Sequence, residues 1–395
     1  MGKGDNSQLS GPPVHVDPNS IPARFAQCVA APEDRAAAIL TVLTATGVYL
    51  GRQSALVYNG DMIYPTLYAL IVTQPSTLAA WYKWFGFLDD PPPVKNSGIS
   101  KAEAVVHLVR DRVDRWDKVY TGKNEDPKWR DTMVDGGVAE KRHLITQRLG
   151  PELGSRRSAA CRQLRDILNA VYHDGEMSAW VNYRDGGFHS VKEAHIALLV
   201  PEPDQQLAAA VCDQLPFLLA RAEHAPVQIG LSDSILSRVV SGLMSATEIV
   251  AGEVTVASDA TRAIQSQAVA KRPHAVRTLL RVAHILAILE RSPVVTETLL
   301  SQAQSVVEAS ESTRASLRQG QCILLRDAIL EFVRSTGLDG LVHHELVRHF
   351  RRHRNVSIDD IKIALDQLAR ERELVQRSVK TGGRDRLEWH LPPLH

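Results

Sequence analysis

The sequence predicts an α/β core, followed by a helical region and by a small α+β domain of the winged-helix type. Short apolar runs rich in β-branched residues, at 67–72, 142–146 and 196–200, are typical of buried strands in an α/β domain. Between residues 232 and 317 the apolar positions follow a helical spacing instead. From residue 320 onward the pattern indicates three short helices and a terminal hairpin, which is the composition of a winged helix.

The helices and strands of the first half are predicted from the same apolar periodicities and from capping, turn and proline residues. The expected helices are 22–51, 79–85, 101–113, 163–171 and 205–221. The expected strands are 55–58, 67–72, 142–146, 177–183, 188–194 and 196–200. Ser100 and Glu103 form a capping box, residues 121–137 are expected to be a polar loop, and residues 184–187 are expected to turn a hairpin. Pro201 is expected to close the last strand.

The same apolar periodicities predict the elements of the helical region and of the C-terminal domain. The expected helices of the region are 232–249, 258–271, 275–291 and 297–317, the last of them capped by Thr296. In the C-terminal domain, Ser357 and Asp360 cap the third helix. Strands at 374–380 and 386–391 then complete the hairpin. The predicted organisation is a disordered leader, a core, a helical lid and a winged helix, at 1–21, 22–228, 229–319 and 320–395.

Composition limits the classes of function. The chain has 395 residues, 44% of them hydrophobic, which is enough for two or three packed domains. Its 46 basic and 45 acidic residues nearly cancel, so a site for a polyanion must be a local patch. The four cysteines show no paired spacing, which argues against disulfides and a zinc site. The N-terminus has no apolar signal core, and the longest apolar stretch, 36–50, is shorter than the ~20 residues that span a bilayer. We therefore expect a cytoplasmic protein without membrane contact.

The turn after the strand at 67–72 has the place of a phosphate-binding loop but lacks its chemistry. Such a loop needs glycines whose N–H groups close around the phosphates, a Lys, and a Ser or Thr for Mg²⁺. Residues 73–80 contain neither Gly nor Lys. The strand at 142–146 is followed by Gln147 and Arg148, where a P-loop ATPase carries acidic residues for Mg²⁺ and water. We therefore expect no ATP turnover, no cofactor, no metal and no catalytic residue.

A basic patch on the winged helix is the candidate site. The second helix and the hairpin carry cations that can contact phosphates, whereas the third helix also carries five acidic residues that repel them. Binding of double-stranded DNA and binding of a protein therefore both remain open. The predicted DNA contacts are Arg348, Arg351, Arg352, Lys362, Arg370, Lys380, Arg384 and Arg386, together with Arg184 at the tip of the core hairpin.

Several segments resemble a known family, and together they extend from about Phe25 to the C-terminus. They are PTLYALIV, SGISKAEAVVHLVRD, EKRHLIT, LRDILNAVYHDGEM, RTLLRVAHILAIL and TGGRDRLEW. These segments are similar to the P-loop ATPases of prophages, plasmids and integrated elements that accompany primases and resemble minichromosome-maintenance helicases. This resemblance implies an AAA+-like core with a lid and a winged helix, a context of mobile-element replication or defence, and assembly with copies of itself or with an active ATPase paralogue.

The family's chemistry is absent at the corresponding positions. Leu78, Ala79 and Ala80 stand where the family has its Lys and Thr or Ser, and only a lid arginine survives, as Arg277 or Arg281. The sequence thus favours a pseudo-ATPase that binds DNA or acts as a scaffold. A divergent ATPase or helicase subunit completed in trans, and a winged-helix transcriptional regulator, are the alternatives.

Two further features have an ordinary structural explanation. With no phosphate to sense, we expect Arg277 and Arg281 to lie on a solvated helix face. His349 and His353 have a spacing that zinc sites use, but no Cys or carboxylate joins them, so we expect a solvated basic helix.

Overall fold

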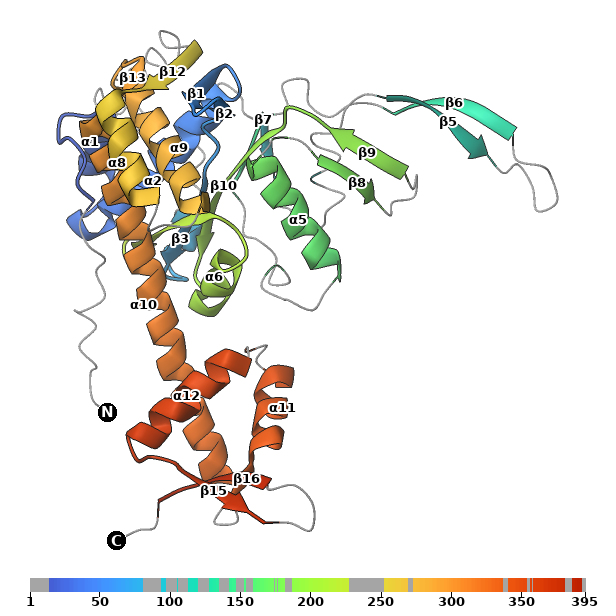
Figure 1. Cartoon of the computed structure of the whole chain (residues 1–395), viewed down its shortest axis with the longest axis vertical. Helices are drawn as coiled ribbons and strands as arrows, with labels where there is room; N and C mark the ends of the chain where they lie inside the picture. The colour runs from blue at the N-terminus through green and yellow to red at the C-terminus, as the bar shows by residue number, and fades with distance from the viewer. Residues whose placement is uncertain are drawn as a thin grey trace. The chain divides into compact units, whose positions relative to one another are not determined.

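A five-stranded parallel sheet forms the centre of the larger of two units in this computed structural model (Figure 1). Its strands, in spatial order, are β11 (Phe217–Ala222), β3 (Tyr68–Thr73), β10 (His195–Glu202), β7 (Arg142–Ile145) and β4 (Val94–Asn96). β3 and β10 are buried along their whole length, as strands of a parallel sheet covered on both faces are. The strands predicted at 67–72, 142–146 and 196–200 are confirmed.

The structure describes residues 14–80, 94–96, 105, 113–119, 128–134, 142–146, 153, 159–173, 175, 177–181, 187–226, 252–268, 273–336, 340–353, 356, 358–380 and 386–392. The chain divides into two compact units, Met1–Arg314 and Ala315–His395.

Helices pack on this sheet from the flanking segments. α1 (Ile21–Val29) and α2 (Arg35–Leu50), joined by the 3₁₀ turn Pro32–Asp34, come from the stretch predicted as helical at 22–51. α2 is buried nearly all round and contacts four of the five strands. At Gly47 an added Cβ would lie 2.1 Å from the Pro65 carbonyl oxygen, so only glycine allows this approach. α5 (Ala159–His173) and α6 (Gln205–Cys212) also contact β10.

A second sheet lies next to α9 and has the order β13-β12-β1-β2. Its members are β1 (Ser54–Tyr58), β2 (Asp61–Ile63), β12 (Gly252–Val256) and β13 (Val294–Val295), with α8 (Ser258–Ala268) and α9 (Pro273–Leu289) between the last two. The prediction of an all-helical region was therefore wrong at β12 and β13. β12 pairs in parallel with β1, which precedes it by almost 200 residues, and pairing at such a distance leaves no local signal.

Three further predictions need correction. The helix expected over 205–221 ends at Cys212, because Pro216 stops it and the following apolar run joins the sheet as β11. The polar loop expected at 121–137 contains β6 (Lys128–Val134), which pairs with β5 (Val113–Val119) in a ribbon whose frequent charges hid the strand period. Pro201 does not close β10, because Glu202 still stands opposite Val72 of β3. The predicted hairpin is confirmed as β8 (Met177–Val181) and β9 (Gly187–Val191).

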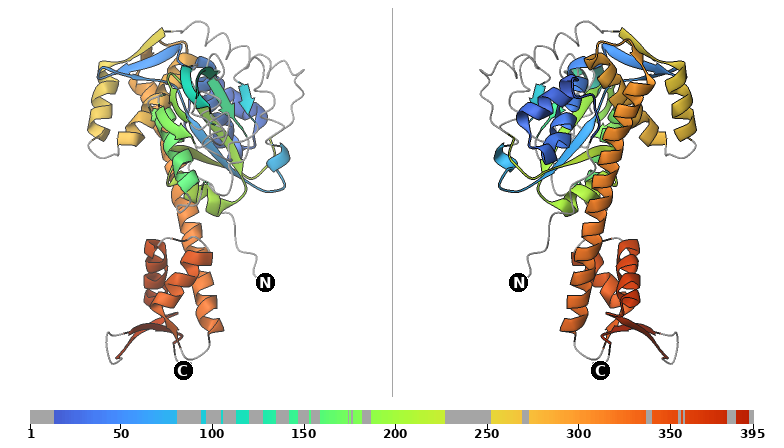
Figure 2. Two further views of the ribbon diagram at one scale, coloured as in Figure 1. Left: turned by 90° about the vertical axis from the view of Figure 1, so that its right-hand side faces the viewer. Right: turned by 90° about the vertical axis from the view of Figure 1, so that its left-hand side faces the viewer.

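The second unit combines three helices with a three-stranded antiparallel sheet. It contains the end of α10 (Glu297–Ser335), then β14 (Leu341–Val342), α11 (His343–His353), α12 (Ile358–Arg370), β15 (Val375–Val379) and β16 (Arg386–His390). The sheet order is β14-β16-β15, and Figure 2 shows helices of this unit on one side of the sheet. Ile329, Phe350, Leu365 and Trp389 belong to the core that joins these elements.

The capping role predicted for Thr296, which lies in the larger unit, is confirmed. Its Oγ1 accepts the Leu299 N–H at the start of α10.

Candidate functional site

The carboxyl ends of β3 and β10 meet at a topological switch point of the parallel sheet. From β3 the chain continues to β4 at one edge, whereas from β10 it crosses to β11 at the opposite edge. Ligands of open α/β sheets bind in the crevice outside the strand ends at such a point. The turn predicted as a phosphate loop without its chemistry begins here, after Thr73.

This turn is closed by hydrogen bonds among its own groups. The hydroxyls of Thr73 and Thr77 are 2.6 Å apart, and Thr77 Oγ1 also donates to the Gln74 carbonyl at 3.0 Å. The Thr77 N–H is bonded to the same carbonyl at 3.1 Å, and Pro75 has no N–H. A phosphate loop instead directs its N–H groups at the ligand. Since helical residues resume at Leu78, only residues 74–77 separate strand and helix.

Two buried carboxylates, Glu202 and Asp34, lie at this edge of the sheet. Glu202 ends β10, is buried, and accepts the Asp204 N–H at 2.9 Å. At the end of β11, the buried Asp34 carboxylate accepts the N–H groups of Glu223 and His224 at 2.8 and 3.0 Å. Negative charge at this position disfavours a triphosphate. Arg221 is the cation of β11, and burial lowers the pKa of its guanidinium. Gln147 and Arg148 lie outside the described residues.

The lid arginine candidates occupy two different environments. The exposed fraction of Arg281 is 2%, so the expectation of a solvated face was wrong for this residue. Its Nη2 donates to the Tyr172 carbonyl, and its guanidinium lies 3.9 Å from the centre of the Tyr172 ring. That ring packs 4.7 Å from the ring of Tyr68, at the amino end of β3. The turn follows the carboxyl end of β3, about 16 Å further along the strand.

Arg281 is therefore placed to hold the end of α5 rather than to contact a ligand at the turn. A cation at a helix C-terminus also interacts favourably with the helix dipole. Arg277 is half exposed, with its Nη2 4.0 Å from Asp61 of β2.

The structure places the predicted DNA contacts of the second unit on several separate elements. Arg348 and Arg351 are exposed on α11, which also contains Arg352, and Lys362 and Arg370 are exposed on α12. Lys380 is exposed directly after β15. Arg184 and Arg384 lie outside the described residues.

Arg386 forms an ion pair with Glu388, a carboxylate of the same strand. Its Nη2 lies 2.8 Å from Glu388 Oε1, and His390 Nε2 lies 3.2 Å from the other oxygen of the same carboxylate. Glu388 is only 8% exposed, so Arg386 compensates a largely buried charge. Sequence reasoning missed this pair, although the i, i+2 spacing of Arg386 and Glu388 in a strand places both on one face.

The outward faces of α11 and α12 carry opposite charge. Among the α11 side chains whose burial the structure describes, the exposed ones are His344, Glu345, Arg348 and Arg351. On α12 they are Ile358, Asp359, Asp360, Lys362, Ile363, Asp366 and Arg370. The first face is basic, whereas three carboxylates and two cations leave the second slightly acidic. Two large apolar side chains, Ile358 and Ile363, are 49% and 57% exposed on α12.

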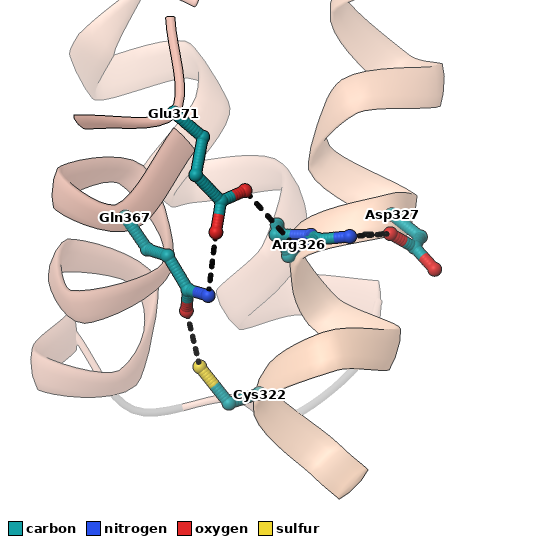
Figure 3. Close-up of polar contacts among 5 residues, drawn as sticks. All are labelled: Cys322, Arg326, Asp327, Gln367 and Glu371. Atoms are coloured by element: carbon teal, nitrogen blue, oxygen red, sulfur yellow. Dashed lines mark hydrogen bonds and ion pairs between the residues drawn. The ribbon is translucent and has the colours of Figure 1, made fainter. Parts of the chain in front are cut away.

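A polar network joins α12 to α10 within the second unit (Figure 3). Arg326 Nη1 donates to Glu371 Oε2 at 2.9 Å, and Gln367 Nε2 donates to the other oxygen of Glu371 at 3.0 Å. The Cys322 thiol donates to Gln367 Oε1 at 3.6 Å. Burial raises the pKa of this thiol, and the nearby Asp360 carboxylate raises it further. The network compensates Glu371, so this carboxylate adds little to the acidic face of α12.

The histidines of α11 have structural contacts. Trp389 Nε1 donates to His343 Nδ1 at 3.1 Å, and the His349 ring stacks on Phe332 with ring centres 4.0 Å apart. In the part of the chain that the structure describes, no group of three or more His, Cys, Asp or Glu residues is arranged to hold a metal ion.

The fold and the site define a mixed α/β protein with a parallel sheet and a separate helix-and-hairpin unit. No family model matches the chain, and no curated protein matches it. Among solved structures, a full-length minichromosome-maintenance homologue from Methanopyrus kandleri is similar, at 14% identity and a TM-score of 0.42. The match covers 77% of this chain and 64% of that chain, so this chain spans less than two thirds of its length. No helix among the described residues is long and apolar enough to cross a membrane.

Proposed function

We propose that this chain is a pseudo-ATPase: an AAA+-like scaffold that does not turn over ATP and carries a C-terminal winged helix for binding duplex DNA. The closed turn between Thr73 and Leu78 is the observation on which the first part rests. A triphosphate needs several free N–H donors and a cation. The turn is poor in both, because the Thr73 and Thr77 hydroxyls and the Thr77 N–H are bonded within it, Pro75 has no N–H, and residues 73–80 contain no Lys.

The opposite charges of α11 and α12 support DNA binding through α11. Phosphate contacts favour a surface that is basic and exposed, which fits Arg348 and Arg351. Lys380 adds a cation at the end of β15, whereas Arg386 is neutralised by Glu388. The proposed DNA surface is therefore α11 with Lys380, and α12 has a smaller part than the sequence predicts.

The cellular context and the partners of this scaffold rest on the sequence resemblance alone. A protein of this type would work in the replication or defence apparatus of a mobile element. It would assemble with further copies of itself or with an active ATPase paralogue. Loss of the nucleotide site need not remove the surfaces through which such subunits meet.

Titration of a fluorescent duplex at several salt concentrations tests the DNA part of the proposal. With about three phosphates neutralised, the logarithm of the binding constant falls against the logarithm of the salt concentration with a slope of about −2.7. Changing Arg348 and Arg351 together to Ala flattens this slope by about 1.8 and weakens binding on every sequence.

Arg334→Ala is the matched control, because Arg334 is exposed on α10 of the same unit. It leaves affinity and slope unchanged. Equal binding by the double variant and the wild type would assign the second unit to protein interaction instead.

A further inference from the structure

The outward face of α12 has the composition of a protein interface rather than of a helix that reads DNA. Ile363 stands in the middle of this face, with Asp359 and Asp366 one turn before and after it and with Arg370 beyond. An exposed apolar residue within a charged rim is typical of protein contacts. The carboxylates on either side of Ile363 would meet phosphates if α12 lay in a groove of DNA, and this is unfavourable.

The network at the other side of α12 fixes the orientation of this face. Gln367 and Glu371 are turned toward Cys322 and Arg326 of α10, as Figure 3 shows. Ile361, Leu365 and Leu368 point into the core. Asp359, Ile363, Asp366 and Arg370 therefore remain on the solvent side of a helix that is held on its other sides.

The chain itself contains a surface of complementary charge. The outward face of α11 presents Glu345, Arg348 and Arg351, which lie on one side of that helix. In an antiparallel pair of helices, Asp366 meets Arg348, Arg370 meets Glu345, and Ile363 lies on the aliphatic stem of Arg351. Both acidic and basic partners are then matched in one register.

We infer that α12 of one copy docks on α11 of a second copy of this chain. The contact is small and partly ionic, so it forms at micromolar concentrations and weakens with salt. The inference does not rest on the proposed DNA binding, but both contacts use Arg348, so DNA and the second copy compete for this residue.

Sedimentation equilibrium of the full chain without DNA tests this inference by reversal of charge. At about 50 mM salt the wild type self-associates, and at about 500 mM salt the association weakens. Asp366→Arg and Arg348→Asp each place like charges opposite one another and raise the dissociation constant by about tenfold or more. The double variant, in which the charges are exchanged, returns to within about threefold of the wild type.

Glu331→Arg is the matched control, since Glu331 is an exposed carboxylate on α10 of the same unit. It leaves association unchanged. A monomeric wild type at low salt, an assembly that persists unchanged in Asp366→Arg, or a double variant no better than the single ones would each overturn the inference. The persisting assembly would point to contacts made by the larger unit, whereas loss of DNA binding alone would leave this inference standing.

Discussion

The guanidinium of Arg281 lies 3.9 Å from the ring centre of Tyr172 and donates a hydrogen bond to the carbonyl of the same residue. The contact joins α9 to the end of α5 inside the core. It gives this arginine a structural task in place of the phosphate-sensing task that the sequence resemblance suggests.

Arg281→Ala should destabilise the protein by about 3 kcal/mol, because it removes a buried side chain and leaves the Tyr172 carbonyl without its donor. Arg277→Ala is the control one turn earlier on the same helix. Arg277 is half exposed, and its contact with Asp61 is long, so its loss should cost less than about 1 kcal/mol. Urea unfolding measures both. Equal costs for the two variants would contradict the structural role of Arg281.

We expect the buried imidazole of His284 to make the protein less stable in acid. Burial lowers the pKa of this imidazole to about 3, and its Nε2 lies 2.8 Å from Ser54 Oγ. The neutral ring is therefore the folded form, whereas the unfolded chain takes up a proton below its ordinary pKa of about 6.5. The free energy of unfolding should fall as the pH drops from about 6.5 toward 3.

His284→Gln should remove part of this slope between pH 7 and 5 in urea unfolding. His344→Gln, at an exposed position of α11, should leave the slope unchanged. A wild type whose stability is flat over this range would show that His284 is not held neutral.

Side chains of α10 form hydrogen bonds with backbone groups on the edge of β11 that no described strand pairs with. Ser310 Oγ accepts the Leu219 N–H at 2.8 Å, and Arg314 Nη2 donates to the Phe217 carbonyl at 2.8 Å. Ser310 and Arg314 are four residues apart, so they lie about 6 Å apart along the helix axis. This distance matches the length of two strand residues, which separate Leu219 from Phe217. Ser310→Ala should cost about 1–3 kcal/mol, because it leaves a buried N–H unpaired. Ser301→Ala, at an exposed site of the same helix, should cost less than about 0.5 kcal/mol. Calorimetric melting compares the two.

Local patterns predicted the buried strands and the helices of the second unit, because burial on both faces or a clear apolar stripe leaves a signal in the residues themselves. β3 and α12 are examples. β12 and the β5–β6 ribbon were missed, since their pairing partners are distant or their residues are mostly charged.

In the candidate site, too, some features could be predicted from the sequence and others could not. The missing Gly and Lys at 73–80 could be read from the sequence, but the hydrogen bond from Thr73 to Thr77 could not. The cations of α11 were found from the sequence, whereas the neutralisation of Arg386 by Glu388 depends on the strand geometry. The burial of Arg281 depends on how α9 packs against α5, which no local spacing reveals.

The melting temperature of the full chain with and without Mg²⁺–ATP is the most direct test of the central claim that the turn at residues 74–77 binds no triphosphate. A ligand present at a hundred times its dissociation constant stabilises a protein by about 2.7 kcal/mol, which shifts the melting temperature by a few degrees. We expect no shift at millimolar ATP, and the same result for Thr77→Ala. A reproducible, Mg²⁺-dependent rise of a few degrees, lost on Thr77→Ala, would contradict the claim and place a working nucleotide site at this turn.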